Sequence, residues 1–247
     1  MDKKYLIASG CSWTDHYFTS DYHRDLDTSW DKWPTILANK LDMEVINLGS
    51  MGSGNEGIYS RVSDFISETP KEKIGLIIVA WSGAARRDWE LIGHRKKWAR
   101  GVLNSPDSIY KKYITSWVSE IVDSKGDSYY FMRRSIRNFY ALQVLCERYN
   151  IPYKQICALD PIGAYQYTKL SFDTHHIDVM NHFFTSSQFE EINKDNFIGW
   201  PIFEYMGGFC LNDILKQNRP KYAISLEDLH PNALGQQLIA DIIHENL

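Results

Sequence analysis

Short apolar runs, each followed by small or polar residues and then by an amphipathic stretch, recur along the first third of the chain. The most continuous run, Ile74 to Trp81, is almost entirely apolar, as expected of a strand that is covered on both faces of its sheet. Tyr5 to Ala8 and Val45 to Leu48 are shorter runs of the same kind. Strands that alternate with helices in this way predict a parallel, doubly wound sheet.

Apolar residues at helical spacing follow these runs. Trp33-Pro34 opens the first such stretch, because proline is tolerated at the first position of a helix. A final helix is expected from Leu234 to Ile243, with Asn232 as its cap. The other expected elements are helices over 58–66 and 136–150 and a fourth strand over 153–158.

Two stretches depart from this alternation of strands and helices. Residues 88–130 contain a helical stripe from Ile109 to Ile121 and a run of basic side chains, which is typical of a solvated face. Residues 160–222 hold aromatics with scattered glycine and proline but show little periodicity. We expect a single domain over 1–247, a three-layer α/β/α unit with a mainly parallel, flavodoxin-like sheet. The two stretches would be helical or loop insertions, which could form a lid.

Composition excludes several classes of function. Apolar residues make up 44% and charged residues 23% of the 247, as in ordinary globular proteins. The net charge of -4 does not favour binding of nucleic acid, whose phosphates attract basic proteins. No run approaches the roughly 18 apolar residues of a membrane span, and the amino terminus does not resemble a signal peptide. We therefore expect a cytoplasmic protein that binds neither nucleic acid nor a membrane; the sequence carries no signal for an oligomeric state.

The sequence favours neither a metal nor a cofactor. Its four cysteines lie far apart with no Cys-x-x-Cys pair, so neither a zinc site nor a disulfide framework is indicated. The group Asp173, His175, His176, Asp178 and His182 lacks a zinc-type repeat of spacing. Gly49-x-x-Gly52-x-Gly54 resembles a dinucleotide loop, but no acidic residue closes a second strand about 20 residues later.

The two ends of the chain carry a candidate for nucleophilic catalysis. Ser12 follows the first strand and the Ser9-Gly10 turn, at the edge where open α/β sheets bind ligands. Near the carboxyl terminus, Glu227-Asp228-Leu229-His230-Pro231-Asn232 precedes the final helix. In such a segment the histidine can serve as the base, and the nearby acidic residue can orient its ring. We expect Ser12 to attack a carbonyl, His230 to take its proton and Asp228 to orient the imidazole.

These motifs resemble those of the SGNH (GDSL-like) hydrolase superfamily. The resemblance rests on Ser12 in Gly-x-Ser, the glycine and asparagine segment after the second strand, and Asp-x-His-Pro-Asn near the end. It spans nearly the whole chain and implies the same flavodoxin-like fold. It favours Ser12 over the neighbouring Cys11 as nucleophile. It leaves open whether the acid is Asp228 or Glu227, because some relatives place aspartate three residues before the histidine.

An oxyanion hole needs donors where negative charge develops. The Ser12 and Gly52 backbone N–H groups are the first candidates, since glycine lets the backbone approach a substrate closely. Asn55 could add a side-chain amide or cap the following helix. One further motif of the family, Gly-x-Asn-Asp after the third strand, is missing here: Ala80-Trp81-Ser82-Gly83 stands in its place, without the asparagine. There the Ser82 hydroxyl could replace the missing amide, and Arg86 could bind an anionic group or brace the loop.

The resemblance implies a serine esterase or deacetylase with a Ser-His-Asp triad. Its expected substrate is a small-molecule or carbohydrate ester, such as an O-acetyl or short acyl group on a sugar. A high aromatic content of 14% is consistent with a surface that binds sugar or acyl groups. Two alternatives stay open at this point: acyl transfer by the same serine, and a non-catalytic binding or structural module that kept the fold.

Overall fold

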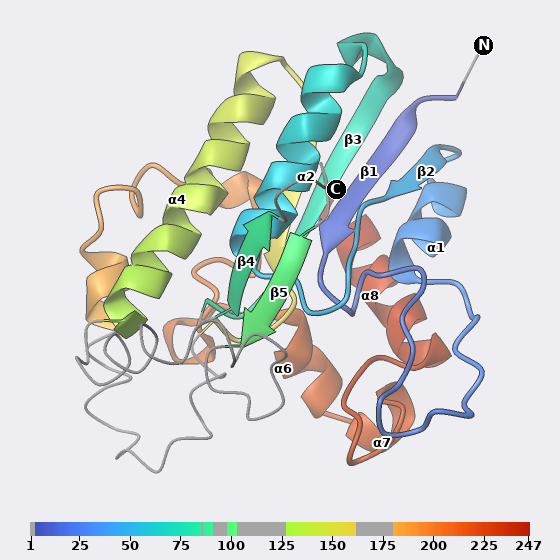
Figure 1. Cartoon of the computed structure of the whole chain (residues 1–247). Coiled ribbons are helices and arrows are strands. Elements are labelled where there is room, and N and C mark those ends of the chain that lie inside the picture. Colours follow the sequence, from blue (N-terminus) through green and yellow to red (C-terminus); the bar gives the residue numbers. More distant parts are fainter. Residues whose placement is uncertain (1–2, 85, 91–97, 103–126, 162–179) are drawn as a thin grey trace.

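A computed structural model describes residues 3–84, 86–90, 98–102, 127–161 and 180–247 (Figure 1). Within these ranges five strands form one parallel sheet, in the order β2-β1-β3-β6-β7. These strands are β1 (Tyr5–Gly10), β2 (Glu44–Asn47), β3 (Ile74–Trp81), β6 (Tyr153–Cys157) and β7 (Phe197–Ile198). This topology confirms the predicted doubly wound sheet. The strand order reverses between β1 and β3, which is the position where such sheets bind ligands.

Helices cover both faces of the sheet (Figure 1). α2 and α4 pack on one face, and α1 and α8 pack on the other. The chain is therefore a three-layer α/β/α structure, as the sequence predicts. The helices and helical turns are α1 (Trp33–Lys40), α2 (Asn55–Glu68), η1 (Lys71–Lys73), α4 (Asp127–Arg148), η3 (Lys194–Asn196), η4 (Glu204–Met206), α6 (Leu211–Lys216), α7 (Arg219–Tyr222) and α8 (Ala233–Glu245).

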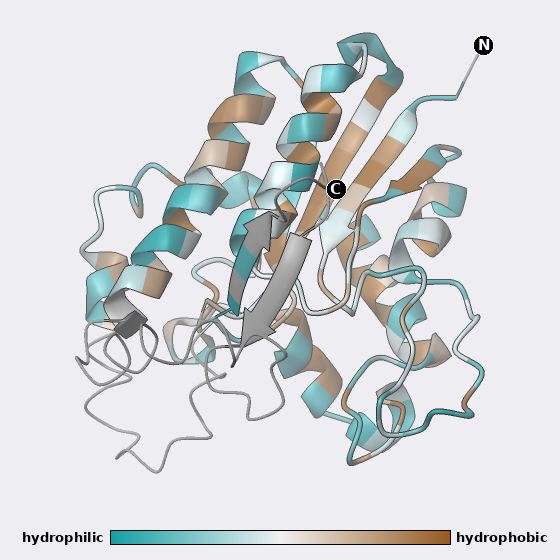
Figure 2. Cartoon of the chain, viewed as in Figure 1, coloured by the Kyte–Doolittle hydropathy of each residue, from teal (hydrophilic) through white to brown (hydrophobic). Residues whose placement is uncertain are grey.

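The central strand β3 contributes to two separate cores, because alternate side chains of a strand point to opposite faces. Figure 2 shows the apolar character of the strands between the two helical layers. The β3 residues on the side of α2 and α4 are Ile77, Val79 and Trp81. Those on the side of α1 and α8 are Leu76, Ile78 and Ala80. Burial on both faces explains why this strand is continuously apolar in sequence.

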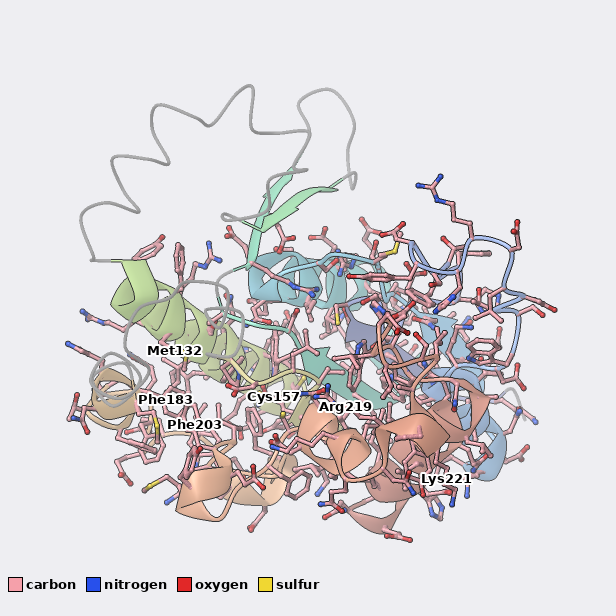
Figure 3. All side chains as sticks on the ribbon, turned by 90° about the horizontal axis from the view of Figure 1, so that it is seen from below. Met132, Cys157, Phe183, Phe203, Arg219 and Lys221 are labelled. Carbon is pink, nitrogen blue, oxygen red and sulfur yellow. The ribbon has the colours of Figure 1, made fainter. Side chains whose placement is uncertain are left out.

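Part of the stretch 160–222 belongs to the core, which differs from its expected role as an insertion. β7 is a fifth sheet strand of only two residues, too short to show any period in the sequence. Beside it, Phe183 packs against Phe203 with ring centroids 5.4 Å apart, near Met132 of α4 (Figure 3). Phe184, Phe189 and Trp200 complete this aromatic cluster. A lid formed by the rest of the stretch stays a prediction.

The stretch 88–130 also differs in part from a helical or loop insertion. β4 (Arg86–Glu90) and β5 (Trp98–Val102) pair antiparallel as a separate two-stranded sheet. β4 packs beside α2, and the hairpin lies toward the carboxyl end of the main sheet (Figure 1). The predicted stripe from Ile109 to Ile121 lies outside the described residues, and the single-domain boundary stays a prediction.

The four cysteines are free and buried. None of the described helices combines the length and the apolar character that crossing a bilayer would need.

Candidate active site

A tight turn after β1 presents Ser12 at the carboxyl end of the sheet. The carbonyl of Cys11 accepts the N–H groups of Thr14, at 2.9 Å, and Asp15, at 3.1 Å. Gly10 is required where β1 enters this turn, because a Cβ there would lie 2.2 Å from Thr14 Oγ1. The turn leaves Ser12 only 4% exposed, next to the switch point between β1 and β3.

The other end of the chain brings an imidazole to this serine. His230 Nε2 lies 2.9 Å from Ser12 Oγ, and His230 Nδ1 lies 2.5 Å from Asp228 Oδ1, although serine and histidine are 218 residues apart. A neutral ring with its proton on Nδ1 donates to the carboxylate and accepts the serine proton at Nε2. Asn232 fixes the segment by capping α8, since its side chain accepts the Gly235 N–H at 3.0 Å. This cap was predicted.

The carboxylate beside His230 is that of Asp228. It is buried, and its second oxygen accepts a hydrogen bond from Ser20 at 2.5 Å. Burial acts to raise the pKa of Asp228, but the hydrogen bonds from Ser20 and His230 outweigh it and hold this pKa below the ordinary value. Glu227, the alternative acid, is exposed, and its N–H donates to the Ser225 hydroxyl.

Side chains hold the loop after β2 at a fixed distance from the Ser12 turn. Asp15 accepts the Met51 N–H at 2.7 Å, and Asn47 donates to the Thr14 carbonyl at 2.7 Å. Gly52 follows with a φ of 76°, a left-handed conformation that favours glycine. Asp15 and Asn47 were not predicted as site residues; Asp15 lies three residues after Ser12, and Asn47 lies in the second strand, two residues before Gly49.

Asn55 joins the start of α2 to the end of β3. Its Oδ1 accepts the Ser82 N–H at 2.8 Å, and its Nδ2 donates to the Ser82 carbonyl at 3.1 Å and to Ser135 Oγ at 3.0 Å. It does not cap the helix, whose N-cap position is Gly54. Its amide would have to break one of these bonds to donate to a substrate. Within the described residues the buried Ser82 hydroxyl has no hydrogen-bond partner.

The cap of α2 comes from β4 instead. The Asp88 carboxylate accepts the N–H groups of Gly54, at 2.9 Å, and Gly57, at 2.8 Å, as a capping side chain would. No local pattern could predict this contact, because 31 residues separate Asp88 from Gly57. Arg86 is half-buried, and its guanidinium donates to the Ser53 carbonyl at 3.4 Å. That contact braces the loop, one of the two roles expected of Arg86.

Other sequence candidates lie apart from this arrangement. Cys11 is fully buried in the core shared with α1 and α8, whereas its neighbour Ser12 contacts the imidazole. Among the described residues no three His, Cys, Asp or Glu side chains gather as a metal ion would require. Of the group considered for metal binding, only His182 falls within the described ranges.

Neither a family model nor a curated protein sequence matches this chain. Solved structures do. TesA superposes with a TM-score of 0.50 at 12% identity, covering 99% of this chain and 98% of that one. The psychrotrophic esterase EstA from Pseudoalteromonas sp. gives 0.48 at 14% identity, covering 98% and 96%. A protein assigned to the G-D-S-L lipolytic family, from Desulfitobacterium hafniense DCB-2, gives 0.47 at 14%, covering 99% of each.

At such low identity a structural likeness shows the fold alone. The chain has the three-layer α/β/α fold of the SGNH-like hydrolases. Ser12 and His230 lie at the carboxyl edge of this fold, where the sequence motifs predict them.

The lowered pKa of Asp228 makes stability depend on pH. A carboxylate with a depressed folded-state pKa stabilises above its unfolded-state pKa, near 4, and loses that contribution as the pH falls through the folded-state value. We expect wild-type protein to lose more free energy of unfolding between about pH 5 and pH 3 than Asp228→Asn does. Urea unfolding at each pH measures the difference.

The matched control for this experiment is Asp64→Asn, whose carboxylate lies exposed on α2. It should keep the wild-type pH dependence. If Asp228→Asn and wild type showed the same acid dependence, the ionised, hydrogen-bonded carboxylate described above would be contradicted.

Proposed function

We propose that this protein is a serine hydrolase that cleaves a carboxylic ester. The observation that carries the proposal is the continuous contact from Ser12 Oγ to His230 Nε2, at 2.9 Å, and from His230 Nδ1 to Asp228, at 2.5 Å. A nucleophile within hydrogen-bond reach of a base, which a third group orients, is the geometry that acyl transfer to serine requires.

In the proposed reaction Ser12 Oγ attacks the ester carbonyl carbon while its proton moves to His230 Nε2. The tetrahedral intermediate then expels the alcohol, which takes that proton from the imidazolium, and an acyl-enzyme forms. A water molecule attacks the acyl group with His230 as its base and releases the acid. Asp228, buried and ionised, stabilises the imidazolium and keeps the Nδ1 proton directed toward itself.

The negative charge on the carbonyl oxygen needs donors, and we assign them to the backbone N–H groups of Ser12 and Gly52. Ser82 is a third candidate. Its hydroxyl is buried without a partner among the described residues, at the end of the strand beside β1. A buried, unpartnered hydroxyl costs free energy, which a substrate oxygen would recover.

For the substrate we propose an O-acetyl or other short acyl ester on a carbohydrate. Support comes from the loop that follows Ser12, where Phe18 packs on the His230 ring and Tyr17 and Tyr22 are exposed at 83% and 69%. Such rings offer an amphipathic surface to a sugar. Turnover of p-nitrophenyl esters from acetate to octanoate tests the acyl preference, and faster cleavage of octanoate would contradict it.

A fluorophosphonate probe should label wild-type protein at Ser12, as located by peptide mass spectrometry. Ser12→Ala should lose both the label and turnover of p-nitrophenyl acetate, since no nucleophile is left. Ser9→Ala removes a different buried hydroxyl, one that lies in β1, and should keep both the label and the turnover. If wild-type protein showed neither label nor turnover, the binding-module alternative would be supported. If the acyl-enzyme formed but water did not hydrolyse it, acyl transfer would be favoured.

Ser82→Ala tests the proposed third donor. Removing one oxyanion donor lowers kcat by about 100- to 1,000-fold elsewhere, with little change in KM when the contact forms only in the transition state. We expect a loss of that order, with fluorophosphonate labelling slowed but retained. An unchanged kcat would remove Ser82 from the site and leave the roles of Ser12 and His230 intact.

A further inference from the structure

The loop between β1 and α1 packs against the segment that carries His230. Phe18 lies on the imidazole with ring centroids 4.4 Å apart. Ser20 bonds to Asp228, and His23 bonds to Ser225. The loop follows the nucleophile directly in the chain, so one continuous segment supplies Ser12 and also contacts the groups that would activate it.

Ser20 makes the closest of these contacts. Its side chain is buried, with 4% exposure, and its Oγ lies 2.5 Å from Asp228 Oδ2. An ionised carboxylate can only accept, so the Ser20 hydroxyl donates. The same Oγ accepts the backbone N–H of His23 at 2.9 Å, which fixes the position of the hydroxyl.

The two oxygens of Asp228 therefore have separate partners. Oδ1 accepts from His230, through Nδ1 at 2.5 Å and the backbone N–H at 3.1 Å, while Oδ2 accepts from Ser20. The torsion that turns an aspartate carboxylate is broad, so its own rotamer preference does not fix the plane of the group. The hydrogen bonds on both sides fix that plane, and Ser20 supplies the one on the side away from the imidazole.

A second contact holds the loop in place. Ser225 Oγ accepts the backbone N–H groups of Asp228, at 2.9 Å, and Glu227, at 3.1 Å. His23 Nε2 lies 2.9 Å from the same Ser225 Oγ and forms a hydrogen bond with it. The segment that carries the acid is thus tied to the loop at Ser20 and again at His23.

We propose that Ser20 is a positioning residue, which holds the Asp228 carboxylate and through it the His230 imidazole in the reactive orientation. This inference rests on the proposed function and names a fourth member of the same unit. Ser20 does not touch the reacting atoms; it acts through Asp228. The Asp228 carboxylate would turn more freely in Ser20→Ala, and its pKa would rise with the loss of the donor.

The test compares Ser20→Ala, Ser20→Thr and Ser9→Ala with wild type. We expect Ser20→Ala to lower kcat for p-nitrophenyl acetate about 10- to 100-fold, as for one lost hydrogen bond to a charged group, with KM unchanged. Ser20→Thr keeps the hydroxyl and should restore most of the rate. Ser9→Ala loses a buried hydroxyl that donates to the Ile58 carbonyl, so it controls for general destabilisation.

A second readout does not depend on activity. Proton NMR follows the downfield resonance of the His230 Nδ1 proton in its hydrogen bond to Asp228. We expect this resonance to broaden and to exchange faster with water in Ser20→Ala, and to persist in Ser20→Thr and Ser9→Ala. A purely structural serine would leave it unchanged in a folded variant.

The outcomes separate the two proposals. An inactive wild type, with an Nδ1 resonance that still responds to Ser20→Ala, would refute the hydrolase and leave the positioning role supported. If wild-type protein is active but Ser20→Ala changes neither kcat nor the Nδ1 resonance, the positioning role is overturned and the hydrolase proposal stands. Equal losses in Ser20→Ala and Ser9→Ala would also overturn it.

Discussion

The contact between Ser12 and His230 depends on how α8 is anchored to the start of the chain. Gln236, buried on the first turns of α8, accepts the Trp33 N–H at 2.8 Å and donates to the Trp13 carbonyl at 3.2 Å. One side chain thus joins the final helix to α1 and to the turn that holds the serine. Apolar packing of α8 and α1 against the sheet supports it, and the Ser12 turn and the His230 segment meet at the carboxyl edge.

Polar side chains at this edge join the loops that lie near Ser12. Asp15 and Asn47 set the spacing between the turn after β1 and the loop after β2. Asn55 ties the end of β3 to α2, and Asp88 caps α2 from the hairpin. Each loop is bonded to its neighbour, which would hold the backbone N–H groups that we propose as oxyanion donors in fixed positions.

Local patterns predicted the elements that bury a long apolar face. The run Ile74 to Trp81 is the observed β3, and α8 begins after the predicted cap. The Ser12 and His230 pair was predicted because each end carries a compact motif. Two features were missed: β7 is only two residues long and so shows no period, and Ser20 meets Asp228 across 208 residues. Asn55 does not cap α2, because Gly54 holds the N-cap position, whereas its role as an oxyanion donor stays a prediction. Its bonds to Ser82 span 27 residues, which nothing in its neighbourhood indicates.

The most direct test of the central claim, that Ser12 and His230 act as one unit, is a double-mutant cycle on turnover of p-nitrophenyl acetate. The kcat/KM of Ser12→Ala, His230→Ala and the double variant should all fall to the same residual level, because removing either member already disables the unit. Losses that multiply in the double variant would mean that the two residues act independently and would contradict the account.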